Sequence, residues 1–266
     1  MRLLFWSRRH PLTGSAPAVV SLTTYGQRLR TVHLAISSAC RGPARPQRVL
    51  LFVDEYERAL RSRTLQRLVK RGLEIIPCEN LGPHKKYYPY VEGLLEAELS
   101  APTTPLVTID DDVIYPARWL SELIAAHAIE PDVVIAHRCH RITRRGESLA
   151  PYAEWLSCRL EKPSYANFST GVSGVLYPVG FLYCLKREGD AFKQQAPSAD
   201  DVWLHSRAVK YGYKTRQVKA TPADYPTIPG TFATSLFRAN VLMGDNDRQI
   251  HACYDSDSLR RICEEV

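Results

Sequence analysis

Short apolar runs alternate with amphipathic segments through the first half of the chain. The apolar runs, which predict buried strands, are residues 18–25, 48–55, 73–79 and 105–112. The amphipathic segments, which predict helices, are residues 29–40, 56–72, 88–100 and 116–128. Strands that alternate with helices favour an α/β, Rossmann-like fold, in which helices cover a mostly parallel sheet.

The second half of the chain has a less regular pattern. It predicts strands at 132–142, 169–178 and 213–219, and a helix at 199–212. No linker-like segment separates the halves, so we expect one domain over residues 1–266. Within it, residues 18–130 form the more regular half and residues 131–250 the less regular one.

Polar side chains follow three of the predicted strands where each one ends. Thr23, Thr24 and Tyr25 close the first strand, Asp54 closes the second, and the stretch "VTIDDDVIYP" at 107–116 contains Asp110–Asp112. In open parallel sheets, ligands bind at the carboxyl ends of the strands. The sequence therefore predicts a binding site at this edge.

Three consecutive carboxylates at a strand end repel one another and are costly to bury. Asp110 and Asp112 are two residues apart, so on extended backbone they point to the same side. Mg²⁺ and Mn²⁺ are hard cations that accept one or two protein carboxylates together with substrate phosphate oxygens. We therefore expect one of these cations at Asp110 and Asp112.

Composition adds limits to this picture. The chain has a net charge of +7 with its basic residues widely spread, which favours anionic ligands without indicating nucleic-acid binding. No run approaches the roughly 18 apolar residues of a membrane-spanning helix. Seven cysteines without a C-x-x-C pair predict reduced thiols and a cytoplasmic protein.

The first residues, "MRLLFWSRRH", combine a short apolar core at Leu3–Trp6 with flanking arginines. This core is too short for a secretory signal. The segment is either a frayed terminus or a peripheral contact with the inner face of the membrane, where the arginines would meet anionic lipid.

The motifs "VSLTTY", "LFVDE", "VTIDDDVIYPARWL" and "ADDVWL", in this order, resemble those of GT-A fold glycosyltransferases. The likeness covers roughly residues 18–220 and is greatest to bacterial family 2-like enzymes of polysaccharide or capsule biosynthesis. It implies a nucleotide-sugar donor, a glycan or lipid-linked acceptor, and transfer with inversion.

The resemblance also implies roles for the residues already named. Thr23, Thr24, Tyr25 and Asp54 would lie near the base and ribose of the donor, and Asp111 near its ribose. Asp110 and Asp112 would hold the metal ion that bridges the donor diphosphate.

A second acidic pair, Asp200 and Asp201, matches the place of the catalytic acid in that family. Attack by an acceptor hydroxyl requires a base, and we expect Asp201 to be that base with Asp200 beside it. The pair is also compatible with an ordinary helix start, because acidic residues favour first turns.

Three further groups of residues are candidates for this site. Lys85 and Lys86 are expected to neutralise donor phosphate. His251 is a candidate third metal ligand, since some GT-A enzymes use a late histidine. The aromatic faces of Trp155 and Trp203 are candidates for the floor of the acceptor site, although core packing would explain them equally well.

Two other readings of the sequence remain open. The stretch "VTIDDDVIY" loosely resembles the first motif of haloacid-dehalogenase-like phosphatases, which also need Mg²⁺. That motif normally begins its domain, whereas three predicted strands precede it here. The other reading is a homologue that binds a sugar or nucleotide without catalysis. The two acidic clusters, Asp110–Asp112 and Asp200–Asp201, argue against it.

Overall fold

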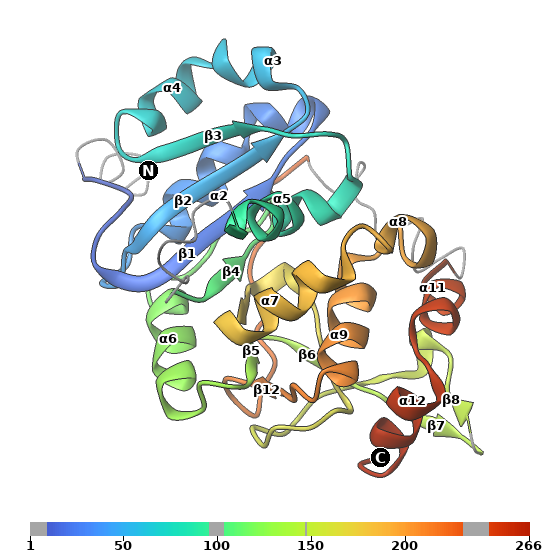
Figure 1. Cartoon of the computed structure of the whole chain (residues 1–266). Coiled ribbons are helices and arrows are strands. Elements are labelled where there is room, and N and C mark those ends of the chain that lie inside the picture. The colour runs from blue at the N-terminus through green and yellow to red at the C-terminus, as the bar shows by residue number, and fades with distance from the viewer. Residues whose placement is uncertain (1–9, 96–103, 147, 231–244) are drawn as a thin grey trace.

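A computed structural model describes residues 10–95, 104–146, 148–230 and 245–266 (Figure 1). In the first half the elements are β1 (Ala16–Thr23), the 3₁₀ turn η1 (Gly26–Arg30), α2 (Val32–Ala39), β2 (Pro46–Val53), α3 (Tyr56–Leu60), α4 (Arg63–Val69), β3 (Leu73–Pro77), η2 (Gly82–Lys86), α5 (Tyr88–Glu92), η3 (Gly93–Leu95), β4 (Leu106–Thr108) and α6 (Trp119–Ile129).

The second half consists of shorter strands and four longer helices. Its elements are β5 (Val134–Ala136), β6 (Cys139–Arg141), β7 (Arg144–Arg145), β8 (Ser148–Leu149), η4 (Tyr152–Glu154), β9 (Leu156–Ser157), β10 (Asn167–Ser169), η5 (Gly171–Ser173), β11 (Val175–Tyr177), α7 (Val179–Glu188), α8 (Phe192–Gln195), α9 (Asp200–Lys210), β12 (Thr215–Gln217), α11 (Asp245–Cys253) and α12 (Ser256–Cys263).

The main sheet has seven strands in the order β12-β5-β11-β4-β1-β2-β3, so both halves of the chain contribute to it. Strands β3, β2, β1 and β4 run parallel, while β11 lies antiparallel between β4 and β5. This arrangement confirms the predicted α/β, mostly parallel sheet. A smaller antiparallel sheet, β10-β6-β9, extends from the second half.

Alternating side chains of the strands supply the two cores. Along β1, Val19 packs into one hydrophobic cluster and Val20 into the other, because successive side chains point to opposite faces. Helices α2, α4 and α6 cover one face, and α5, α7 and α9 cover the other (Figure 1). Because both faces of the central strands are covered, these strands have long apolar runs rather than strict alternation.

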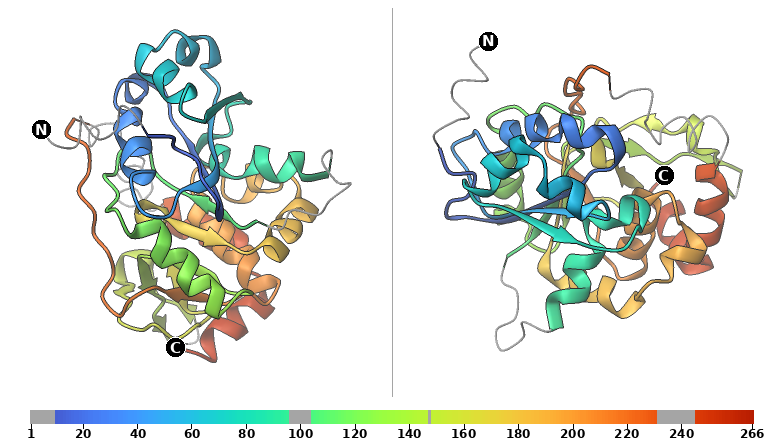
Figure 2. Two further views of the ribbon diagram at one scale, coloured as in Figure 1. Left: turned by 90° about the vertical axis from the view of Figure 1, so that its left-hand side faces the viewer. Right: turned by 90° about the horizontal axis from the view of Figure 1, so that it is seen from above.

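The outer elements lie at the two ends of the sheet. The short helices α3 and α4 pack on the edge strand β3, and the C-terminal helices α11 and α12 pack on α9, as the turned views in Figure 2 show. Among the described residues, no helix is long and apolar enough to cross a bilayer.

Several element boundaries differ from the predictions. The expected helix at 56–72 is interrupted, because Ser62 ends α3 and caps α4 by accepting a hydrogen bond from the backbone N–H of Leu65 at 3.4 Å. The expected strand at 132–142 divides into β5 and β6, which belong to different sheets. The predicted helix at 88–100 is seen only to residue 95. Its remainder and the N-terminal membrane contact lie outside the described residues.

All seven cysteines lie in the described part of the chain and are free thiols. Burial raises the pKa of Cys40 to about 12 and that of Cys253 to about 11, so neither thiol is reactive at neutral pH.

Candidate active site

A pocket of about 620 Å³ opens at the carboxyl edge of the sheet, between the two halves of the chain. The first half contributes residues that follow β1, β3 and β4, and the second half contributes residues around β6, β10, η5 and α9. The lining residues are Thr23, Tyr25, Arg28, Asn80, Gly82, Pro83, Lys85, Lys86, Asp110, Asp111, Asp112, Arg138, His140, Tyr152, Phe168, Thr170, Val172, Pro197, Ser198, Ala199, Asp200, Asp201, Val202, Thr227 and Asn246.

The acidic triplet forms a turn directly after β4. The strand ends at Thr108, and Ile109 extends the pairing by donating its backbone N–H to Ser21 O at 3.0 Å. The backbone N–H of Asp110 then donates to the buried Tyr115 hydroxyl at 2.9 Å. Buried anchors on both sides of this turn therefore fix the direction in which its carboxylates leave the sheet.

Arg28 holds two of the three carboxylates together. Its guanidinium lies 2.6 Å from Asp111 Oδ1 and 3.0 Å from Asp112 Oδ2. Thr24 also donates its hydroxyl to Asp111 Oδ2 at 2.6 Å. Asp111 is thus satisfied by protein groups and only 5% exposed, which makes it a structural anchor of the turn as much as a ligand-facing residue.

Lys86 supplies the cation for Asp110. Its ammonium lies 2.6 Å from Asp110 Oδ1 and 3.2 Å from Asp200 Oδ2, and so bridges the two acidic clusters. Lys85 points elsewhere and pairs with Asp54. The sequence predicted both lysines as phosphate-neutralising groups, but in this structure each is bound to a carboxylate.

The second acidic cluster begins α9. Asp201 accepts the backbone N–H of Gly171 with both carboxylate oxygens, each at 3.1 Å. A Cβ at Gly171 would lie 3.2 Å from Asp201 Oδ1 and 3.8 Å from Asp110 Oδ1. A Cβ here would crowd the Asp201 carboxylate, and glycine lets the two acidic clusters approach each other closely across its backbone.

The charges in this pocket are only partly balanced. Burial, followed by the charge of Asp110, raises the pKa of Asp112 to about 6. Burial, followed by the charge of Asp200, raises the pKa of Asp201 well above its usual range. Five aspartates therefore share two directly bound cations, those of Arg28 and Lys86. Such raised carboxyl pKa values in a cleft are typical of functional sites.

The other predicted donor-binding residues lie at the same edge with different degrees of access. Tyr25 lines the pocket and is 37% exposed, with the guanidinium carbon of Arg28 5.6 Å from its ring centre. Thr23 lines the pocket too, but its hydroxyl donates to Phe52 O at 2.8 Å. Thr24 and Asp54 do not line the pocket. Each instead binds a residue that does: Thr24 donates a hydrogen bond to Asp111, and Asp54 pairs with Lys85.

Two predicted acceptor-binding residues are placed elsewhere. Trp203 is 1% exposed and packs between Phe192 and Arg207, and Trp155 is 6% exposed. Neither tryptophan lines the pocket. Both sit in the hydrophobic core, where large aromatic side chains bury the most apolar area.

Other aromatic side chains, Tyr152, Phe168 and His140, line the pocket and are called the aromatic wall here. The rings of Tyr152 and Phe168 line the pocket with their centres 5.8 Å apart, and His140 lies 5.7 Å from Tyr152. Trp155 packs behind both, at 5.0 Å from Tyr152 and 5.1 Å from Phe168. The local sequence marks none of these as pocket residues, because β6 and β10 bring them together from distant segments.

His251 also lies away from the acidic cluster. It is exposed on α11 and does not line the pocket, although Asn246 of the same helix does. Among the described residues, no group of three or more His, Cys, Asp and Glu side chains is arranged to hold a metal ion.

Asp110 and Asp112 nevertheless have the chemistry that Mg²⁺ and Mn²⁺ require. Both present hard carboxylate oxygens to the same pocket, with 24% and 14% of their side chains exposed. Mg²⁺ usually takes one or two carboxylates and leaves its other positions to phosphate oxygens and water. The excess of negative charge at the site favours such a cation.

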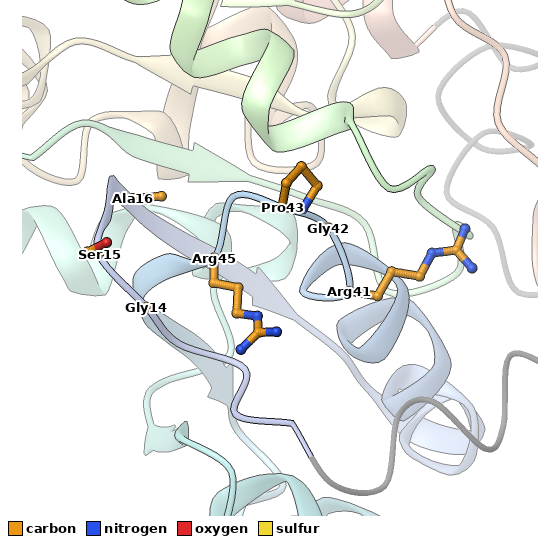
Figure 3. Close-up of a pocket in the computed structure, with 7 residues that line it drawn as sticks. All are labelled: Gly14, Ser15, Ala16, Arg41, Gly42, Pro43 and Arg45. Atoms are coloured by element: carbon orange, nitrogen blue, oxygen red, sulfur yellow. The ribbon is translucent and has the colours of Figure 1, made fainter.

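A second hollow, of about 610 Å³, lies at the opposite edge of the sheet, where β1 and β2 begin (Figure 3). It is lined by Gly14, Ser15, Ala16, Arg41, Gly42, Pro43 and Arg45. Arg41 turns toward the chain near Tyr115, whose carbonyl oxygen accepts from it at 3.1 Å. This hollow contains no carboxylate and none of the predicted site residues.

Comparison with known proteins supports the fold. No known protein family and no curated protein matches the sequence. Among solved structures, TarS 1–349 from S. aureus, a glycosyltransferase, matches with a TM-score of 0.51 at 15% identity. The match covers 78% of this chain and 58% of that structure.

A 4-diphosphocytidyl-2C-methyl-D-erythritol synthase also matches, with a TM-score of 0.47, 13% identity, and coverage of 85% of this chain and 99% of that one. The likeness to TarS shows a GT-A-like fold, as the resemblance predicted.

Proposed function

We propose that this protein is a glycosyltransferase that moves a sugar from a nucleotide-sugar donor to a glycan or lipid-linked acceptor. One observation carries the proposal: two acidic clusters from different halves of the chain face each other in one pocket across Gly171. One cluster follows β4 and the other begins α9, so a donor held by the first lies within reach of the second.

The donor would be bound along the first half of the chain. The exposed ring of Tyr25 is available to stack on the nucleotide base. Asp110 and Asp112 would hold Mg²⁺ or Mn²⁺ against the diphosphate. When bound, this cation stabilises the negative charge that develops on the leaving nucleoside diphosphate.

Asp201 is the proposed base. It takes the proton of the acceptor hydroxyl as the hydroxyl oxygen forms a bond to the anomeric carbon. The bond from that carbon to the diphosphate oxygen breaks, and the electron pair leaves with the nucleoside diphosphate. Its raised pKa suits the role, because a base works best when its pKa lies near the working pH. Attack from the side opposite the diphosphate inverts the anomeric centre.

The aromatic wall provides the acceptor site in this proposal. The half-buried ring of Tyr152, with Phe168 packed beside it, presents apolar surface that suits the CH groups of a sugar, and His140 adds polar atoms next to it. A glycan of a cell-surface polysaccharide is the acceptor class that the sequence resemblance implies, and the wall is compatible with it.

The test is incubation of the protein with a panel of sugar nucleotides, with Mn²⁺ or Mg²⁺ and with chelator as the control. We expect slow, metal-dependent release of nucleoside diphosphate that accelerates when a suitable acceptor glycan is added. Release of inorganic phosphate from phosphate monoesters would instead support a phosphatase. Nucleotide binding without either product would support a binding protein and contradict the proposal.

A further inference from the structure

The ammonium of Lys86 lies between the two acidic clusters. It is 2.6 Å from Asp110 and 3.2 Å from Asp200, with 14% of the side chain exposed. A Cβ at Gly171 would lie 3.6 Å from this ammonium and 3.2 Å from Asp201 Oδ1. One cation therefore serves carboxylates from both halves of the chain.

The backbone of Lys86 is fixed, so any movement here belongs to the side chain. Lys86 ends η2, and its carbonyl oxygen accepts the hydroxyl of Ser21 at 2.6 Å. Two residues earlier, His84 is fully buried, stacks on Phe192 and contacts Ala196 O at 2.7 Å. Beyond this anchored turn, the lysine stem has four rotatable carbons that can carry its charge from one acceptor to another.

The charges around Asp110 set up a competition. Arg28 binds Asp111 and Asp112, which leaves Lys86 as the cation within ion-pair distance of Asp110. A divalent cation that binds Asp110 and Asp112 would repel the ammonium next to it. The ammonium already lies 3.2 Å from Asp200, and Asp201 is the next residue, so it can form an ion pair with this acidic pair instead.

We propose that Lys86 is an internal counter-ion that holds Asp110 until a divalent cation binds, and that cation binding moves its ammonium wholly onto the Asp200–Asp201 pair. This inference rests on the proposed function, because it assumes the same cation at Asp110 and Asp112. The inference adds regulation to that site. Cation binding at Asp110 and Asp112 would move the positive charge of Lys86 next to Asp201, the proposed base, before the acceptor reacts. The donor complex would then bind before the acceptor.

The test measures Mn²⁺ binding to the nucleotide-free protein by electron paramagnetic resonance of the free ion. Lys86→Met removes the competing charge but keeps the length of the stem, and we expect it to bind Mn²⁺ at least about tenfold more tightly than the unmodified protein. Lys193→Met is the control, because Lys193 pairs with Asp190 on the surface and does not line the pocket, and the Mn²⁺ affinity of this variant should stay within about twofold. Lys86→Met that binds Mn²⁺ equally well or more weakly overturns the inference.

A structural measurement on the unmodified protein tests the inference even if Lys86→Met fails to fold. In crystals of the unmodified protein soaked with Mn²⁺ and a nucleoside diphosphate, the ammonium should leave Asp110 and contact Asp200 or Asp201. An ammonium that stays on Asp110 overturns the inference. Tight Mn²⁺ binding without any effect of Lys86→Met refutes only this inference, whereas no Mn²⁺ binding by either protein refutes the metal site of the proposed function as well.

Discussion

Glu188 and Asp112 are both carboxylates with little exposure, yet their pKa values move in opposite directions. Burial alone would raise the pKa of Glu188, but three hydrogen bonds outweigh it and lower the value to about 2. These bonds come from Lys210 at 2.6 Å, Tyr211 at 2.5 Å and Arg207 at 2.8 Å. At Asp112 burial prevails, and the pKa rises to about 6.

The difference separates two uses of buried charge. The Glu188 cluster joins the end of α7 to α9 and is fully paired, so its charge stabilises the fold. The pocket carboxylates are under-paired, so their charge is a cost that a bound cation or substrate would remove. Removing charge from the first should therefore harm stability, and removing it from the second should harm function.

The largest expected effect is on turnover, from Asp201→Asn. The amide cannot accept the acceptor's proton, so kcat should fall by about 10²- to 10⁴-fold while nucleotide binding is kept. Transfer is measured with the best donor from the panel, and Asp190→Asn, an exposed acid of a surface ion pair, is the control. Near-normal turnover in Asp201→Asn would remove this residue from the chemistry.

The next effect is on stability, from Glu188→Gln. The change leaves Arg207 buried without its charged partner and should lower the free energy of unfolding by about 3 kcal/mol at pH 7. Because the folded-state pKa is depressed, this contribution is complete above about pH 4.5 and is lost as the pH falls toward 2. Urea unfolding of both proteins across pH 2–7 measures it, and a constant difference would contradict the assignment.

Asp112→Asn should act in the opposite sense on stability. The folded-state pKa is raised, so ionised Asp112 destabilises the metal-free protein above about pH 6, and this penalty disappears as the pH falls toward 4. The variant should therefore be more stable by about 1–2 kcal/mol at pH 7 and equal at pH 4. Thermal unfolding in chelator checks this. The same variant should lose metal-dependent turnover, and a variant that is both less stable and active would break the comparison.

The smallest expected effect concerns an uncharged side chain of the pocket. Tyr25→Ala removes the exposed ring proposed to stack on the base and should weaken nucleoside diphosphate binding by about 1 kcal/mol, or fivefold. Isothermal titration with several nucleotides measures the loss, and Leu160→Ala, an exposed apolar residue that does not line the pocket, is the control. Equal losses in both variants would show that the ring has no specific role.

The donor side of the pocket could be predicted from sequence because its signals are local. Apolar runs mark the strands, parallel strands end at one edge, and Asp110–Asp112 directly follow such a run. Thr23 and Tyr25 were predicted by the same reasoning, whereas Asp200 and Asp201 were predicted from the family resemblance, and all four line the pocket.

The rest depends on packing between distant segments. Arg28 lies in a segment next to a predicted helix, and nothing in its neighbourhood indicates that it will bind carboxylates more than eighty residues away. Trp203 and Phe168 are equally buried aromatic residues of one core cluster, yet only Phe168 borders the pocket. Their positions are decided by the way α9 and the small sheet pack, which no local pattern encodes.

Strand β11 is reversed relative to its neighbours, and this has a consequence for how the protein can change in evolution. Val175, where β11 begins, pairs with Thr108, where β4 ends. The turn that precedes β11 therefore lies at the edge of the sheet where the parallel strands end. The backbone N–H of Gly171 in this turn donates to the Asp201 carboxylate. Most active-site loops at such an edge are free to lengthen, but this one is tethered at both sides. Natural variation in substrate choice should thus accumulate in the segment between β6 and β10, while the turn at Gly171 keeps its length.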